Sequence, residues 1–144
     1  MKDQILEEVK SYPYLGLEIS NNGNFKMAQK SLYNKALRAL FKLKKLIYGA
    51  KLKPYICLKL FDQLIKPICL YGSEIWGPST INLADTEGNN GKLEATFDKI
   101  LCEKLNLSFS KFILGVHKKA QNSAVHGELG RLPLGVDIVS AIVR

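Results

Sequence analysis

The sequence predicts a mainly α-helical protein with a short β-strand or hairpin at its N-terminal end. Three observations predict this class: an apolar stripe at helical spacing over residues 25–47, further stripes of this kind after residue 54, and one alternating segment before residue 21. A chain of 144 residues is long enough to bury one sizeable core. We therefore expect the strand or hairpin to be followed by a bundle of about four to five helices.

The segment YPYLGLEIS at 12–20 predicts the strand, because Leu15, Leu17 and Ile19 alternate with small or polar residues. The NNGN that follows is a turn signal, and Asn24 is placed to cap the next helix. We expect residues 1–24 to form a strand and turn, and residues 25–144 to form the helical domain.

The helix predicted over residues 25–47 has two different faces. Its basic side gathers Lys35, Arg38, Lys42 and Lys45. Gly49 is placed to end this helix in the left-handed conformation. The opposite, apolar stripe consists of Phe25, Ala28, Leu32, Ala36, Ala39, Leu40, Leu43, Leu46 and Ile47.

The basic charge is concentrated around this helix. No acidic residue lies between Glu18 and Asp62, and ten Lys and Arg residues do, so this window carries +10 while the whole chain carries +8. Solvated helix faces usually intersperse acids with bases, so a polyanion, nucleic acid first, is the expected partner. The alternative is a small helical structural or interaction domain whose basic face is only solvated. Leu37 and Phe41 lie on the basic side and favour a further protein contact there.

The later elements follow from the same kind of pattern. A helix over 55–70 should begin at Pro54 and kink or end at Pro67. Trp76 is expected in the core. A loop is predicted at 78–91, and a third helix from about residue 92 to Gly115 has a pattern that allows a break near 106–108.

The C-terminal part is predicted to hold two short helices. Residues 123–129 form the first, closed by Gly130, and the LPLG segment at 132–135 is predicted as a turn. Residues 136–144 begin an amphipathic helix that stops after barely two turns without a cap signal. We expect this last helix to be truncated.

No catalytic centre is expected from the acidic residues. Asp62, Asp85, Asp98 and Asp137 belong to separate predicted elements and share no motif, whereas two-metal chemistry needs convergent carboxylates. The chain is therefore expected to lack enzymatic activity of its own and to need no cofactor.

The cysteines and histidines have structural interpretations. Cys57, Cys69 and Cys102 form no CxxC pair and are expected as buried free thiols. His117 is expected in a solvated connector or against a phosphate, and His126 in local packing. Glu128 and Arg131 are three residues apart and are predicted to pair.

The sequence contains no apolar run long enough to span a membrane, and its first ten residues lack the apolar stretch of a signal peptide. A nuclear or cytoplasmic location is expected by default. Membrane-surface binding by the basic helix ranks last, because its apolar face is needed for the core.

Four stretches, in this order, resemble the segment after the catalytic palm of non-LTR (LINE-type) retrotransposon reverse transcriptases. The LYGSEIWG and GELGRLP segments are the most specific, and the resemblance covers residues 9–144. The stretches are YPYLGLEISNNGNF at 12–25, KALRALFKLKK at 35–45, LFDQLIKPICLYGSEIWG at 60–77 and KFILGVHKKAQNSAVHGELGRLPL at 111–134.

The resemblance implies a fragment of an RNA-directed DNA polymerase: the hairpin called the primer grip, then the helical thumb. In that family, palm aspartates of a (F/Y)xDD motif hold Mg²⁺, and no such motif occurs here. The implied partners are an RNA–DNA or RNA duplex, bound with low sequence specificity, and the missing palm domain. An unpaired hairpin edge also implies self-association. The implied nucleic-acid-binding residues are Tyr14, Leu15, Gly16, Lys35, Arg38, Lys42, Lys45, Lys118 and Lys119.

Overall fold

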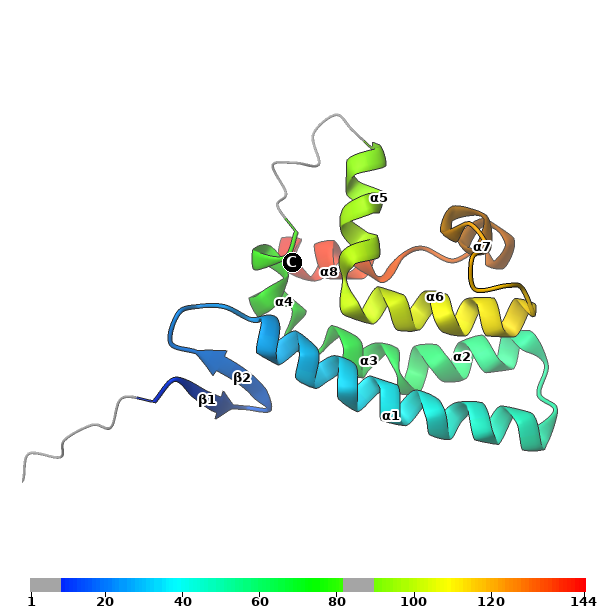
Figure 1. Cartoon of the computed structure of the whole chain (residues 1–144), viewed down its shortest axis with the longest axis horizontal. Coiled ribbons are helices and arrows are strands. Elements are labelled where there is room, and N and C mark those ends of the chain that lie inside the picture. The colour runs from blue at the N-terminus through cyan, green and yellow to red at the C-terminus, as the bar shows by residue number, and fades with distance from the viewer. Residues whose placement is uncertain (1–8, 82–89) are drawn as a thin grey trace, which may run out of the picture.

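The computed structural model describes residues 9–81 and 90–144, with side chains at 9–81 and 95–144. The predicted fold class is confirmed: the protein is mainly α-helical, with a two-stranded antiparallel hairpin at its N-terminal end (Figure 1). The elements are β1 (Ser11–Tyr14), β2 (Leu17–Ser20), α1 (Lys26–Ala50), α2 (Pro54–Leu64), α3 (Lys66–Leu70), α4 (Ser73–Trp76), the 3₁₀ turn η1 (Gly77–Ser79), α5 (Asn90–Lys99), α6 (Leu101–Leu114), α7 (Asn122–Leu129) and α8 (Leu134–Val143). Most of the loop predicted at 78–91 lies outside the described residues.

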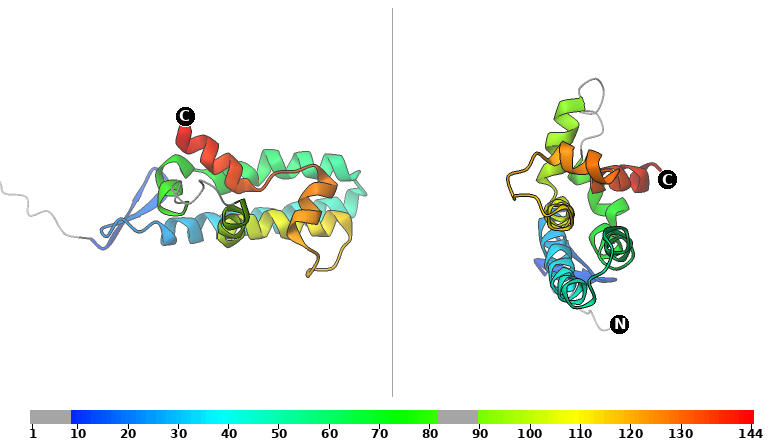
Figure 2. Two further views of the ribbon diagram at one scale, coloured as in Figure 1. Left: turned by 90° about the horizontal axis from the view of Figure 1, so that it is seen from above. Right: turned by 90° about the vertical axis from the view of Figure 1, so that its right-hand side faces the viewer.

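Three helices, α1, α2 and α6, lie side by side along the long axis and enclose the core (Figure 2). Phe61 of α2 stacks on Phe109 of α6 with ring centroids 4.9 Å apart, and both side chains are fully buried. Burying an aromatic side chain of this size stabilises the fold by roughly 2–3 kcal/mol. The inner face of α1 completes the core with Ala28, Leu32, Ala36, Leu40, Leu43 and Ile47.

The hairpin replaces the single strand that the alternating pattern predicts. β1 and β2 pair antiparallel, with Tyr14 opposite Leu17. The chain reverses at Leu15 and Gly16, whose φ angles of 46° and 84° are both positive, as a two-residue hairpin turn of type I′ requires. Only Leu17 of the predicted apolar face is buried, while Leu15 is 73% and Ile19 is 38% exposed.

The ends of α1 differ slightly from the prediction. The helix begins at Lys26 with Phe25, not the predicted Asn24, as its N-cap residue. Asn24 still accepts a hydrogen bond of 3.0 Å at its Oδ1 from the Lys26 N–H. Gly49 lies inside the helix, and the left-handed residue at its C-terminal end is Lys51, with φ of 46°. Leu46, predicted on the apolar face, is 55% exposed.

Two long predicted helices are each divided. The first is interrupted where predicted, because α2 ends at Leu64 and α3 carries Pro67 in its first turn. The second bends at Ile100, which has extended backbone (φ −64°, ψ 127°) between α5 and α6. The predicted break at 106–108 is wrong, since those residues continue α6. Figure 1 shows α5 leaving the direction of α6 at this point.

The segment after α3 holds the hairpin in place. The hydroxyl of Tyr71 donates a hydrogen bond of 2.6 Å to the carbonyl oxygen of Leu15, across 56 positions of sequence. Gly72 adopts a positive φ of 64° and packs so closely on Leu17 that a Cβ there would collide with its side chain. Trp76 is 1% exposed, as predicted, and its Nε1 donates to the Tyr71 carbonyl at 2.9 Å.

The C-terminal helices follow the prediction in part. Gly130 ends α7 with φ of 60°, as expected. The predicted turn at 132–135 is shorter, because Leu134 already begins α8. A carboxylate causes this early start: Oε2 of Glu103 on α6 accepts the Leu134 N–H at 2.6 Å. Next to it, Gly135 packs against the ring of Phe97, where a Cβ would clash.

The cysteines are buried and free, as predicted. Cys57 belongs to α2, Cys69 to α3 and Cys102 to α6.

Candidate nucleic-acid interface

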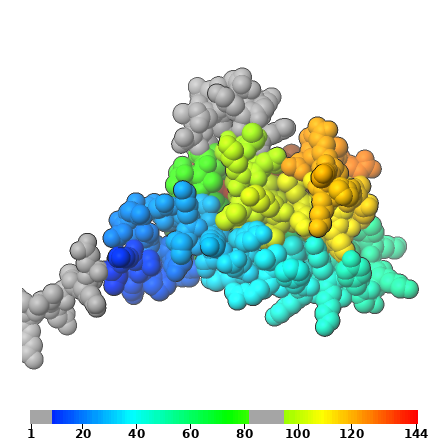
Figure 3. Space-filling view, viewed as in Figure 1, coloured from blue at the N-terminus to red at the C-terminus, as the bar shows by residue number. Residues whose placement is uncertain are grey.

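One side of α1 faces solvent and carries the predicted basic residues. We call Lys35, Arg38, Lys42 and Lys45 the outer basic face; all four side chains are exposed. Spacings of three, four and three residues keep them on one side of the helix. At 1.5 Å rise per residue they extend over about 15 Å, roughly the length of four nucleotides along one strand of a duplex. In Figure 3, α1 forms the lower edge of the molecule, with no other segment over it.

The charges of the outer basic face form no ion pair with any described residue. Within the part of the chain that the structure describes, the ion pairs involve Lys66, Arg131 and His126, and none involves the outer basic face. The whole of α1 contains no acidic residue. Four cations in a short row therefore repel one another, and their positive potential attracts a polyanion.

Lys44 belongs to the same helix but not to this face. Its ammonium lies over the ring of Phe112 on α6, 5.0 Å from the ring centroid. Partial burial lowers the pKa of Lys44, because desolvation disfavours its charged form. The sequence pattern missed this residue, since only the position of α6 shows that Lys44 is turned inward.

Apolar side chains are exposed beside the outer basic face. Phe41 is 64% exposed and Tyr48 is 72% exposed, although the Tyr48 ring makes an edge contact with Phe112. Met27 and Leu46 are also more than half exposed on α1. Leu37 is only partly exposed and packs against the core. Such a mixture of cations and exposed rings is suited both to stacking on bases and to docking a protein.

The predicted hairpin residues lie at the tip of the hairpin. The side chains of Tyr14 and Leu15 are 57% and 73% exposed. Gly16 has φ of 84°, which favours glycine, and the position a Cβ would take is 3.6 Å from the Tyr71 ring. The Leu15 carbonyl is the acceptor for Tyr71.

Lys118 and Lys119 are exposed in the connector between α6 and α7. This connector is ordered by local bonds: Nζ of Lys111 donates to the Lys118 carbonyl at 2.9 Å, and the Lys119 N–H donates to Nδ1 of His117 at 3.2 Å. Figures 1 and 2 place this connector and the hairpin at opposite ends of the long axis. The predicted site residues are thus spread along the molecule, with the outer basic face between the two ends.

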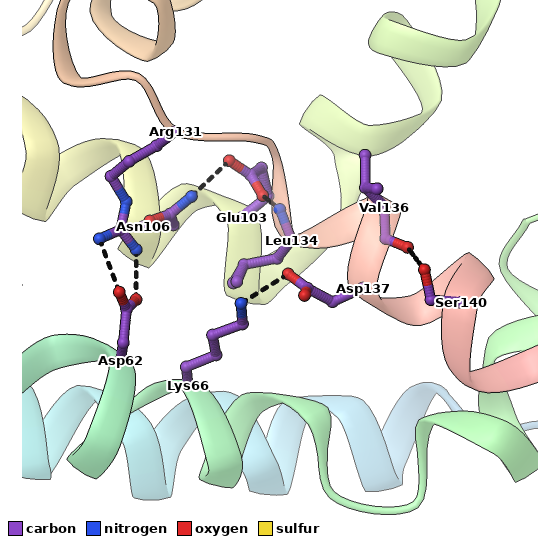
Figure 4. Close-up of polar contacts among 9 residues, drawn as sticks. All are labelled: Asp62, Lys66, Glu103, Asn106, Arg131, Leu134, Val136, Asp137 and Ser140. Atoms are coloured by element: carbon purple, nitrogen blue, oxygen red, sulfur yellow. Dashed lines mark hydrogen bonds and ion pairs between the residues drawn. The ribbon is translucent and has the colours of Figure 1, made fainter. Parts of the chain in front are cut away.

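The acidic residues lie apart and pair with separate partners (Figure 4). Arg131 forms a bidentate pair with Asp62 of α2, so the predicted Glu128–Arg131 pair is wrong. Asp137 pairs with Lys66 at 2.9 Å. Asp85 lies outside the described residues. Among the residues described, no three His, Cys, Asp or Glu side chains come together as metal ligands would.

A buried polar cluster is the feature that the sequence did not indicate. Glu103 is completely buried and accepts hydrogen bonds from Asn106 Nδ2 at 3.0 Å and from the Leu134 N–H. Nε2 of His126 lies 3.2 Å from Oε1 of Glu103, although neither ring nitrogen of His126 has hydrogen-bonding geometry to a partner. Glu103, Asn106 and His126 are called the interior polar cluster below. It joins α6, α7 and α8.

Comparison with known proteins found no matching family model, no matching curated protein and no matching solved structure.

None of the helices among the described residues is both long enough and apolar enough to cross a membrane.

Proposed function

We propose that this chain is a non-catalytic element that grips a nucleic-acid duplex, an RNA–DNA hybrid or an RNA duplex, through the outer basic face. The observation that carries the proposal is the row of four exposed cations on α1, which have no ion-pair partner among the described residues. Lysine and arginine in such a row contact phosphates and fix the position of a duplex without reading its sequence.

The resemblance to non-LTR reverse transcriptases supports a more specific form of the proposal. The chain would be the primer-grip and thumb region of an RNA-directed DNA polymerase, with the Mg²⁺-binding palm supplied outside these residues. Two stretches that carry the resemblance lie in contact, because Tyr71 of LYGSEIWG bonds the turn at Leu15 and Gly16.

Fluorescence anisotropy with a labelled RNA–DNA hybrid tests duplex binding directly. With about four phosphates neutralised, log K should fall with log salt at a slope of roughly −3 to −4. An affinity that does not change with salt would contradict phosphate contact. Scrambling the hybrid sequence should leave the affinity unchanged, because the contacts are made to the backbone.

A charge-matched pair of variants locates the binding site. The quadruple variant Lys35→Gln, Arg38→Gln, Lys42→Gln and Lys45→Gln should lose most of the affinity and of the salt slope. The control replaces four exposed lysines on other elements with glutamine: Lys53, Lys59, Lys99 and Lys104. Equal losses in the two variants would reduce the proposal to nonspecific net-charge attraction.

A protein-interaction role is the second candidate, and the exposed apolar residues beside the outer basic face favour it. Phe41, Tyr48 and Leu46 are each more than half exposed. Under this function the wild type and the quadruple glutamine variant bind the duplex equally weakly or not at all. The variant Phe41→Ser, in contrast, abolishes self-association. Sedimentation velocity of the wild type against Phe41→Ser measures self-association through this surface.

A further inference from the structure

An open groove of about 620 Å³, which we call the end groove, lies at the end of the bundle opposite the hairpin. It is formed by the last turn of α1, the connector from α1 to α2 and the end of α6 (Figure 1). Its walls are mainly aliphatic and include Ile47, Leu52, Pro54, Ile113 and Val116. A groove of this size is large enough to take more than one side chain of a binding partner.

The rim of the end groove exposes apolar side chains to solvent. Tyr48 of α1 is 72% exposed, and Val116, just after α6, is 42% exposed. The Phe112 ring also lines the groove, but the Tyr48 ring and the Lys44 ammonium already contact it. Apart from Tyr48, none of the described lining residues has a hydroxyl or amide side chain with which to bond the edge of a nucleobase. The groove therefore suits the aliphatic side chains of a protein partner better than a base.

The charged residues that line the end groove are both lysines. Lys51 and Lys111 belong to its walls, and neither forms an ion pair with a described residue. Nζ of Lys111 donates to the Lys118 carbonyl at 2.9 Å and to Oδ1 of Asn122 at 2.8 Å, which leaves one of its three N–H groups for a ligand. Asp98 is connected to Lys111 through the side chain of Asn122 and does not line the groove.

Two segments of the sequence without acidic residues meet at this end of the molecule. Residues 44–61 and 104–127 together contain nine lysines and no aspartate or glutamate. The packing of α1 and α2 against α6 brings the two segments together. Their positive potential attracts an acidic partner and opposes a second copy of this chain that presents the same end, because like charges repel. Charge complementarity therefore selects an acidic occupant for the end groove.

We propose that the end groove docks an acidic amphipathic helix of another protein, with its apolar side chains in the groove and its carboxylates against Lys51 and Lys111. A helix that lies in an apolar groove inserts side chains at i, i+3, i+4 and i+7. The inserted side chains supply most of the affinity, while the charges at the edge speed association and fix the orientation. None of the lining residues belongs to the outer basic face, so this site is separate from the proposed duplex site.

A synthetic peptide tests the end groove in the intact chain. The probe is a fluorescein-labelled peptide of about 14 residues, with leucine at i, i+3, i+4 and i+7 and glutamate on its other face. Its anisotropy should rise in a saturable way as the protein is added. The same peptide with serine in place of leucine should bind at least about tenfold more weakly, and so should a peptide with lysine in place of glutamate. Equal binding of the three peptides, or no binding of the first, would overturn the proposal.

The variant Val116→Glu tests the apolar rim of the groove. It places a carboxylate where the peptide carries leucine and glutamate, so peptide affinity should fall by about tenfold or more. Val143→Glu is the matched control, because Val143 is 73% exposed on α8, and it should bind the peptide as the wild type does.

The variant Lys51→Gly tests the charge of the groove without threatening the fold. Glycine suits the positive φ of 46° at this position, so the melting temperature should hold or rise. Peptide affinity should nevertheless fall by about two- to fivefold, since one lysine is lost from the edge. Lys30→Gln, exposed near the start of α1, removes the same charge elsewhere and should keep the affinity. If Val116→Glu and Lys51→Gly both bind the peptide like the wild type, the end groove is not the docking site.

Two competitors identify other kinds of occupant. An RNA–DNA hybrid that displaces the peptide from the quadruple glutamine variant of α1 would assign the end groove to nucleic acid. Phosphatidylserine vesicles that displace it would assign the groove to a membrane surface, and either result contradicts a protein partner. Without competitor, the quadruple glutamine variant should bind the peptide even where its duplex binding is lost, so failure of the duplex proposal and failure of this one are distinguishable.

Discussion

The outer basic face and the interior polar cluster handle charge in opposite ways. On α1, four cations face solvent on a helix that contains no acidic residue. Around α6, one carboxylate is completely buried and receives two hydrogen bonds and a close imidazole. Removing a buried acceptor leaves its donors unpaired, whereas removing an exposed charge leaves nothing unpaired. The interior group thus specifies how the helices pack, and the exposed groups remain available to a ligand.

The largest effect is expected from Glu103→Ala. It leaves the Asn106 amide and the Leu134 N–H without their acceptor and opens a cavity in the core, so the free energy of unfolding should fall by about 3 kcal/mol. Urea denaturation followed by far-UV circular dichroism measures this change. Glu128→Ala, exposed on α7, is the control and should change stability by less than about 0.5 kcal/mol. Similar losses of unfolding free energy in Glu103→Ala and Glu128→Ala would show that the buried carboxylate supports the fold no more than an exposed one does.

An intermediate effect is expected from alkaline pH. A hydrogen bond with Cys102, and then burial, raise the pKa of the Cys69 thiol well above its ordinary value of 9.0. The folded state keeps this proton where the unfolded state loses it, so the stabilisation is complete below about pH 9 and decreases above it, by about 1.4 kcal/mol per pH unit.

The readout is the difference in unfolding free energy between wild type and Cys69→Ala under reducing conditions, measured across this range. As the pH rises above about 9, the wild type should lose stability relative to Cys69→Ala, which has no thiol to ionise at this position. Parallel curves would show that the thiol ionises equally in both states.

The smallest effect is expected when the outer basic face is neutralised. The quadruple glutamine variant relieves like-charge repulsion at spacings of three and four residues, so stability should rise by about 0.5 kcal/mol at low salt. The gain should vanish at high salt, where exposed charges are screened. Thermal unfolding at two salt concentrations measures it. A loss of stability would show that these cations support the fold.

Helical periodicity and turn residues made the main helices predictable. The stripe that includes Leu32, Leu40 and Leu43 marks the inner face of α1, and Pro67 and Gly130 mark real boundaries. Local signals were sufficient here because each boundary depends on the backbone chemistry of one residue.

The errors arise where contacts distant in sequence decide the structure. Leu15 has a positive φ that leucine rarely adopts, and its turn is supported by Tyr71, 56 residues away. Arg131 bonds Asp62 rather than the nearby Glu128 because α2 lies next to its connector. The apolar pattern continues through Ile100, so the bend there leaves no local signal.

In the site, the exposed row on α1 could be predicted because helical geometry alone determines it. The interior polar cluster could not, since it depends on where α7 and α8 come to lie against α6.

The hydrogen bond from Tyr71 to Leu15 has a consequence for the order of folding. The hairpin is made early in synthesis, but the group that holds its tip emerges 56 residues later. Synthesis at about 5–20 residues per second needs seconds to add those residues, whereas a hairpin forms in about 1–10 μs. A growing chain can therefore pack its hairpin against α1 but lacks the bond to the hairpin tip until α3 and Tyr71 are made, so docking of the tip belongs to the late steps of folding.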